Sequence, residues 1–297
     1  MSILSNPQGT PERVWSLIAG LGALGGRLPR GEFSSILNPG YSAGGQQVAA
    51  QATNAANGTG AATALELVER IGDEIQLHDV GELKTPAQLA DYVHDFLCSR
   101  DEGNIEAVIA EAYAWLVVES HSRRDLGWLY ELGAAEFADL VDAGLVGEDE
   151  DGRLMNPTKV PAWRRWLLFM GLSVKMPDAR LVDYPLPARR IEIEMRRAGV
   201  EEQTSMPAGA FVDLLANRCP YLDRGRLFRQ ACARKGYTAD TRTLSAVLSN
   251  ALRDLSSEGK ISLKLSRDTA DAISLCPDPT TRSVSFDEVE IWPEVKH

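Results

Sequence analysis

The sequence predicts a mainly helical fold with short antiparallel strands, because one kind of segment occurs three times. Each segment is an amphipathic helix, then a glycine, then a short strand of alternating apolar and polar residues. The glycines are Gly72, Gly171 and Gly259, which are separated by 99 and 88 residues. A glycine suits the left-handed backbone that ends a helix, and alternation is typical of a half-exposed strand. We therefore expect a tandem of related units.

The best-formed unit spans residues 205–276. A first helix follows Pro207, and a second covers Leu222–Lys235. The third carries an apolar stripe at helical spacing, made of Leu244, Val247, Leu248, Ala251, Leu252 and Leu255. Ile261–Leu265 and Ala272–Leu275 then read as a two-stranded hairpin with a polar tip. This order resembles winged-helix proteins, which implies a tandem of winged helix-turn-helix units.

The first unit, residues 1–82, follows the same pattern more loosely. Helices are expected after Pro11, at Phe33–Leu37 and at 61–71, with a strand after Gly72. Residues 40–63 are rich in Gly, Ala, Asn and Gln, so a small-residue helix and a mobile loop both remain open there.

Three further segments complete the predicted organisation. A middle unit, residues 83–186, has helices near 86–99, 105–120, 134–143 and 157–170, followed by a strand at Leu172–Met176, and a winged-helix arrangement is one reading of it. Residues 187–204 are expected to form a connecting helix. Residues 277–297 form an acidic tail, in which 284–286 could add an edge strand.

Composition and charge bound the class of protein. The 297 residues carry a net charge of −11, which argues against a chain coated in nucleic acid. No apolar run approaches the ~18 residues of a membrane span, and the N-terminus has no export signal, so a cytoplasmic location is expected. The cysteines, Cys98, Cys219, Cys232 and Cys276, form no Cys-x-x-Cys pair and are expected to be free thiols, mostly in the core.

The charge is unevenly distributed. Residues 205–275 hold eleven Lys or Arg and seven Asp or Glu, which gives +4 in an acidic chain. Such asymmetry suggests a different partner for this region. Chance clustering of solvated side chains remains the alternative.

Two glycine motifs resemble nucleotide-binding loops but lack the necessary partners. Gly20-Leu-Gly22-Ala-Leu-Gly25 fits the dinucleotide fingerprint, yet Pro29 interrupts the helix that should follow. We expect a helix end that runs into a loop. In Gly147–Gly152, four carboxylates between the glycines would repel phosphate, so an acidic loop is expected.

No catalytic, cofactor or metal site is predicted. The histidines His78, His94, His121 and His297 lack metal-ligand spacing, and no nucleophile elbow occurs. Trp163 and Trp166 share an apolar helical face with Leu167 and Met170 and are expected in the core. The protein is therefore expected not to be an enzyme, although a pocket of convergent titratable groups would escape sequence analysis.

The third helix of the 205–276 unit is the sharpest candidate for binding. Opposite its apolar stripe lies a polar and basic face without an acidic residue between 241 and 253. Arg, Asn and Ser are residue types that read DNA bases and phosphates. The predicted nucleic-acid-binding residues are Arg242, Ser245, Ser249, Asn250 and Arg253, with Lys264 and Arg267 on the wing. A solvent-facing helix is the alternative.

The length and the opening residues, Met1-Ser-Ile-Leu followed by Val14-Trp-Ser-Leu, resemble the DpdG family, which is encoded with bacterial systems that place 7-deazaguanines in DNA and restrict foreign DNA. That resemblance implies a defence accessory subunit without known catalysis. We expect a non-catalytic DNA-binding or adaptor subunit, with double-stranded DNA and other subunits as partners and a homodimer left open. The alternatives are a scaffold that docks on an ATPase or nuclease, and a transcriptional regulator.

Overall fold

The computed structural model describes residues 2–37, 53–79, 83–145, 153–176, 183–200, 203–266, 271–278 and 285–292. The described chain is mainly helical with antiparallel sheets of two or three strands, as the sequence predicts. It divides into unit 1, which is Met1–Glu106 with Pro157–Met170, and unit 2, which is Ala107–Asn156 with Gly171–His297. This division differs from the segments expected from the sequence, because the middle segment contributes to both units.

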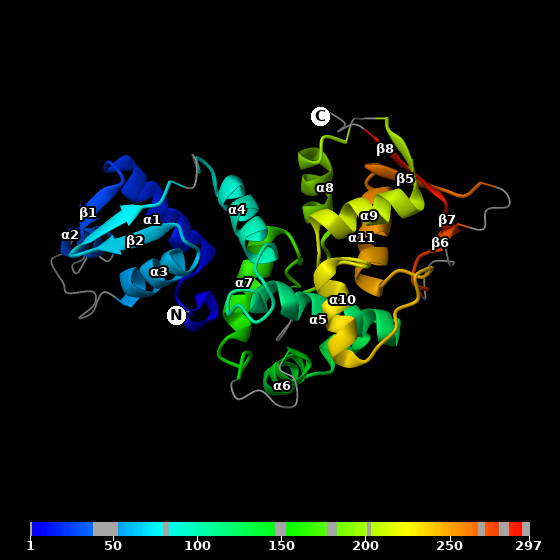
Figure 1. The fold of residues 1–297 in the computed structure, drawn as a ribbon, viewed down its shortest axis with the longest axis horizontal. Coiled ribbons are helices and arrows are strands. Elements are labelled where there is room, and N and C mark those ends of the chain that lie inside the picture. Colours follow the sequence, from blue (N-terminus) through cyan, green and yellow to red (C-terminus); the bar gives the residue numbers. More distant parts are fainter. Residues whose placement is uncertain are drawn as a thin grey trace. The chain divides into compact units, whose positions relative to one another are not determined.

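Unit 1 contains a helix–strand module that we call module A. Its elements are α1 (Pro11–Ala23), β1 (Arg27–Pro29), α2 (Arg30–Leu37), α3 (Thr53–Ala64), β2 (Val68–Ile71) and β3 (Glu74–Leu77). The strands form one antiparallel sheet in the order β1-β3-β2, at the blue and cyan end of the chain in Figure 1, where β1 and β2 are labelled. The glycine-rich stretch predicted to end a helix does so, since α1 stops at Ala23 and Gly25 and Gly26 have positive φ angles.

The helix predicted at 61–71 is wrong. Helix α3 ends at Ala64, Glu66 takes a left-handed φ of 56°, and Val68–Ile71 forms a strand. Gly72, which has a positive φ, lies in the turn of the β2–β3 hairpin. Val68–Ile71 is a strand because pairing with β3 satisfies its backbone groups. Of residues 40–63, the part from Thr53 is the small-residue helix, and 40–52 lie outside the described residues.

Two longer helices complete the core of unit 1. α4 (Pro86–Cys98) begins with a capping box between Thr85 and Gln88, and α7 (Val160–Met170) packs against it. The tryptophans of α7 are buried, with Trp163 at 0% and Trp166 at 1% exposure, which confirms the prediction that they are core residues. A 3₁₀ turn at Ile3–Ser5 packs against α3.

Unit 2 is organised around α5 (Val108–Arg123). Residues 108–121 of this helix are all buried, as expected for a helix covered on every side. It packs against α6 (Ala134–Leu145), α10 (Arg226–Lys235) and α11 (Ala246–Ser257). A 3₁₀ turn at Gly127–Tyr130 follows α5.

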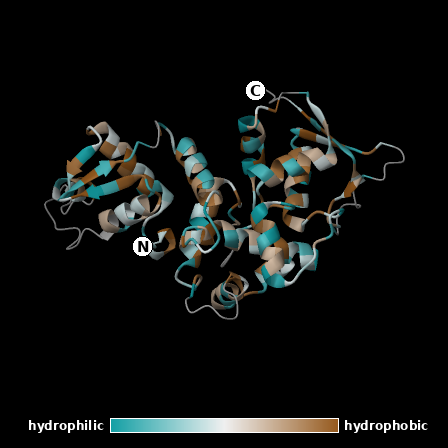
Figure 2. Ribbon diagram, in the orientation of Figure 1, coloured by the Kyte–Doolittle hydropathy of each residue, from teal (hydrophilic) through white to brown (hydrophobic). Residues whose placement is uncertain are grey.

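The rest of unit 2 contains a second helix–strand module, module B. It consists of α8 (Ala188–Arg197), β4 (Ser205–Pro207), α9 (Ala208–Arg218), α10, α11, β5 (Ile261–Lys264) and β8 (Glu288–Ile291). β6 (Ile273–Ser274) and β7 (Ser285–Phe286) lie between β5 and β8 in the sequence and pair with each other. Charged residues make α8 mostly teal in Figure 2, and its Glu194 pairs with Arg197 and Arg218 at 2.6 and 2.7 Å.

The hairpin predicted between Ile261–Leu265 and Ala272–Leu275 is wrong. β5 pairs with β8, and β6 pairs with β7, so both partner strands come from the segment predicted as an acidic tail. β8 is the central strand of the order β4-β8-β5 and lies beside β5 in Figure 1. Val289 and Ile291 alternate with glutamates, so this strand turns an apolar face to the core and a charged face outward. The strand predicted at Leu172–Met176 is reduced to one bridge, Val174 with Tyr184.

Modules A and B share their strand order and register. In module A Pro29 is opposite Glu74, and in module B Pro207 is opposite Glu288. The first strand and second helix also share a sequence pattern, Leu-Pro-x-Gly-x-Phe at 28–33 and Met-Pro-x-Gly-x-Phe at 206–211. Both phenylalanines are buried, Phe33 at 2% and Phe211 at 0% exposure. The chain therefore contains the same arrangement twice.

The central position of β8 is testable with one substitution. Val289→Asp places a carboxylate at a fully buried position, so we expect a loss of about 3 kcal/mol or more in the free energy of unfolding. Val174→Asp is the matched control, because Val174 is 48% exposed and the expected loss is below about 1 kcal/mol. Urea denaturation followed by circular dichroism measures both. Equal midpoints for the two variants would show that residues 285–292 are a dispensable tail.

Candidate functional site

The serines predicted to face DNA have no exposed surface. Ser245 and Ser249 are both 0% exposed, because α11 packs against α5, α8 and β5. Ser245 is the N-cap of α11, and its Oγ accepts a hydrogen bond from the Leu248 N–H at 3.2 Å. The Oγ of Ser249 accepts one from the Cys276 N–H at 2.8 Å. The expectation that these serines lie on an open face is therefore wrong.

The other two predicted residues on α11 also bind within unit 2. Asn250 Nδ2 donates to the Tyr184 hydroxyl at 2.7 Å, and Arg253 Nη1 donates to Asn250 Oδ1 at 3.0 Å. Arg253 Nη2 donates in addition to the Cys276 carbonyl. The face that the sequence assigned to nucleic acid is thus occupied by the chain itself.

The remaining predicted residues lie away from that face. Arg242 is exposed, and its side chain makes no hydrogen bond or ion pair within the described ranges. Lys264 is exposed and pairs with Glu290 at 2.7 Å, and this pair raises the pKa of the ammonium. Arg267 lies outside the described residues. That these cations contact nucleic acid stays a prediction.

A pocket in unit 2 gathers titratable side chains that sequence analysis did not connect. It has a volume of about 580 Å³ and lies among α5, α10 and the segment 237–244. Its buried lining residues include His121, Asp223, Phe228 and Leu244, and Tyr237 lines it as well. A pocket of this size with a few convergent polar groups is the usual form of a small-molecule site.

The hydrogen bonds of His121 define its tautomer. Nε2 faces two carbonyl oxygens, of Thr243 at 2.9 Å and Asp240 at 3.3 Å, so it carries a proton. In the neutral ring Nδ1 then accepts from the Tyr237 hydroxyl at 2.8 Å. Because both nitrogens are engaged, His121 positions the 237–243 segment and is not available as a metal ligand.

Asp223 connects the pocket to α11. Its two carboxylate oxygens accept hydrogen bonds from Ser245, one from the N–H at 2.7 Å and one from Oγ at 2.6 Å. Burial raises the pKa of Asp223, and the bonds from Ser245 and the nearby His121 oppose that shift. The group is therefore a buried hydrogen-bond acceptor beside an open volume.

Arg224 lies at the edge of the same pocket in an unusual backbone conformation. Its φ is 64°, a left-handed value that non-glycine residues seldom adopt. The following Gly225 packs so closely on the backbone of Pro220 that a Cβ would collide with it. The guanidinium pairs with Asp213 at 3.2 Å and donates to the Thr241 carbonyl at 3.1 Å, which holds it at the pocket. A second cavity of about 350 Å³ also contacts Arg224.

No sequence signal identified this pocket. His121 and Tyr237 are separated by 116 residues, and the tight turn at 220–225 becomes visible only through the fold.

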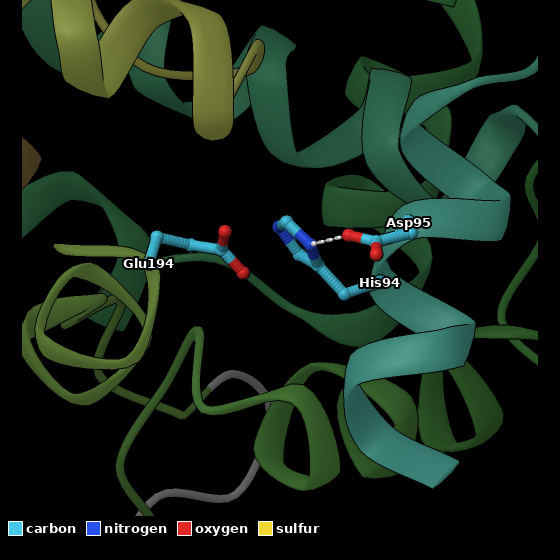
Figure 3. Close-up of side chains that lie close together, drawn as sticks. All are labelled: His94, Asp95 and Glu194. Carbon is cyan, nitrogen blue, oxygen red and sulfur yellow. Dashed lines mark hydrogen bonds and ion pairs between the residues drawn. The ribbon is translucent and has the colours of Figure 1, made fainter. Parts of the chain in front are cut away.

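Outside this pocket, His94 makes the other notable histidine contact. Nδ1 of His94 lies 3.2 Å from Oδ1 of Asp95, and both residues come from α4 of unit 1 (Figure 3). The close-up also draws Glu194, which belongs to α8 of unit 2 and whose ion pairs are described above.

All four cysteines lie in the described residues, none of them is in a disulfide, as predicted, and three are buried. Burial raises the pKa of the Cys219 thiol to about 12 and that of Cys232 to about 11. Because the thiolate is the reactive form, we expect iodoacetamide to label half-buried Cys98 first at about pH 8. Peptide mass spectrometry of the folded protein measures the order, and labelling after unfolding is the control. Labelling of Cys219 as fast as Cys98 would contradict the burial.

Asp223 gives a pH prediction. Because its pKa is raised in the folded protein, the unfolded chain releases this proton first, and stability falls as pH rises from about 4 through the raised pKa. Between about pH 4 and pH 7, we expect the stability of Asp223→Asn, measured as the urea midpoint, to fall less than that of the native protein. Asp213→Asn is the exposed control. An unchanged slope in Asp223→Asn would show that this carboxyl does not titrate abnormally.

Comparison with known proteins gives one match. Neither a curated protein nor a solved structure matches the chain. Among the described residues, no helix is long and apolar enough to cross a bilayer. A family model described as DpdG-like matches residues 1–269, which is most of the sequence. The chain therefore belongs to the DpdG-like family.

Proposed function

We propose that this protein is a non-catalytic adaptor subunit of a defence-associated DNA-modification system and acts in the cytoplasm. Family membership supports the association with DNA modification. The adaptor role rests on the contacts and the composition of α3 in module A and α11 in module B.

Both modules are proposed to be winged helices. In module A the order helix, strand, helix, helix, strand, strand is the order of that fold, with the first strand paired to the last. Module B repeats it with an additional helix and with β6 and β7 inserted between its last two strands. In DNA-binding members of this class, the helix that precedes the hairpin enters the major groove.

Neither α3 of module A nor α11 of module B offers the surface that groove reading needs. In module B the polar residues of α11 bind Asp223, Tyr184 and Cys276 within the unit. In module A the sequence of α3, Thr-Asn-Ala-Ala-Asn-Gly-Thr-Gly-Ala-Ala-Thr-Ala, contains no charged residue to contact phosphate. The occupied face of α11 is the observation that carries the proposal, because side chains held within the unit are not free to read bases.

DNA binding is the second candidate. Exposed Arg242 makes no side-chain interaction within the described part of the chain, and exposed Lys264 lies on the strand next to β8. Cations in such positions hold phosphates without reading sequence.

Fluorescence anisotropy with labelled duplex DNA over a salt series separates the two candidates. If the chain is an adaptor, we expect weak binding that Arg242→Glu with Lys264→Glu leaves within about twofold of the native value. Arg70→Glu with Arg165→Glu, at exposed positions of β2 and α7, is the control with the same change in net charge. Strong, steeply salt-dependent binding that only the double variant loses would replace the adaptor proposal by DNA binding.

The adaptor proposal also predicts a stable complex. Co-expression with the proteins encoded beside it, followed by size-exclusion chromatography, should yield a common peak. Ile36→Asp tests an exposed apolar position of module A, and Leu265→Asp tests one of module B, with exposures of 49% and 57%. Elution of the native chain alone in the presence of all its neighbours would contradict the proposal.

A further inference from the structure

Helix α4 carries a thiol, an imidazole and a carboxylate in contact with one another. Cys98 Sγ lies 3.7 Å from Nε2 of His94, which is one helical turn earlier, and the two atoms are within hydrogen-bond range for sulfur. Nδ1 of the same ring lies 3.2 Å from Oδ1 of Asp95 (Figure 3). All three residues lie in unit 1, and the adaptor role uses none of them.

The carboxylate determines which nitrogen of His94 carries the proton. An ionised carboxylate only accepts hydrogen bonds, so in the neutral ring Nδ1 donates to Asp95. Nε2 is then the unprotonated nitrogen, and the Cys98 thiol donates to its lone pair. A nucleophile that donates to a base, with the base oriented by a third group, is the arrangement that activates a thiol.

The charges around the pair favour a proton on the ring. The Asp95 carboxylate contacts Nδ1 directly and stabilises an imidazolium. His94 also lies near the C-terminal end of α4, which favours a cation and disfavours a thiolate at Cys98. Arg100 opposes the effect on the thiolate, because its Nε donates to a carbonyl of the last turn at 3.3 Å and holds a positive charge there. Its Nη1 pairs with exposed Glu66, which makes this opposition partial.

Cys98 is the cysteine that a small molecule can reach. It is half-buried, whereas Cys219, Cys232 and Cys276 are buried. Burial raises the pKa of each of those three thiols. His94 is 1% exposed, so the base is shielded from water while the residue that carries the thiol is partly accessible. Thiolate character and access together determine which cysteine of a protein is oxidised.

From this geometry we propose that Cys98 is a modification site, a thiol that His94 activates for oxidation by hydroperoxides. The thiol proton moves to Nε2 of His94, and the sulfur attacks one oxygen of the hydroperoxide. An S–O bond forms as the O–O bond breaks, and the leaving oxygen takes the proton from the ring. The sulfur loses two electrons to the peroxide, and the products are a sulfenic acid and either water or an alcohol. The site is independent of the adaptor role.

Oxidation of the full chain by hydrogen peroxide tests the proposal. Dimedone traps the sulfenic acid, and peptide mass spectrometry measures its rate of formation at Cys98. At about pH 7 we expect oxidation to be at least about tenfold faster in the folded protein than in the same protein unfolded in urea. Exposure alone would act in the opposite direction, because unfolding makes the thiol fully accessible. An equal or slower rate in the folded protein would overturn the proposal.

Substitutions of the two neighbours test their roles. His94→Gln removes the base, so the rate in the folded protein should fall to that of the unfolded protein or below. Asp95→Ala changes an exposed side chain, remains informative if His94→Gln misfolds, and should lower the rate several-fold because the ring loses its orienting partner. Asp101→Ala removes an exposed carboxylate outside α4 and is the matched control. In urea the native protein and all variants should react alike. If Asp95→Ala and Asp101→Ala react at equal rates when folded, the proposed arrangement is wrong.

Discussion

The hydrogen bonds between Asp223 and Ser245 fix much of unit 2. They join the segment between α9 and α10 to Ser245, the N-cap of α11, and they do so with a carboxylate that is almost wholly buried. A buried charge persists only where hydrogen bonds stabilise it, so the start of α11 cannot move without a large cost. Ser249 then holds Cys276 further along the same helix. The polar face of α11 is thus internal structure, and this constraint decides what the module can contact.

Sequence periodicity predicted the helices well because each depends on local spacing and caps. The expected helices at 86–99, 134–143 and 157–170 correspond to α4, α6 and α7 within a few residues. Pairing of strands is not local, so periodicity offers no basis for choosing β8 over β6 as the partner of β5. The prediction that the polar face of α11 is open was wrong for a related reason. A polar residue that faces solvent and one that binds a distant backbone group have the same pattern in a sequence.

The repeat of Leu-Pro-x-Gly-x-Phe as Met-Pro-x-Gly-x-Phe was visible in the sequence and would have aligned the two modules. It places a buried phenylalanine at the same position of the second helix in each module. Beyond this shared frame the modules differ in charge. α3 is uncharged and small, whereas module B carries most of its cations in ion pairs, including Lys260 with Glu192 and Arg218 with Glu194. The basic residues that give residues 205–275 their net positive charge are therefore largely paired within the fold.

Hydrogen–deuterium exchange of α11, with and without duplex DNA, tests the central claim that this face is internal. The amides of residues 246–257 should exchange slowly in the free protein and at the same rate when DNA is present. Fast exchange in the free protein, or protection of α11 that appears only with DNA, would contradict the claim.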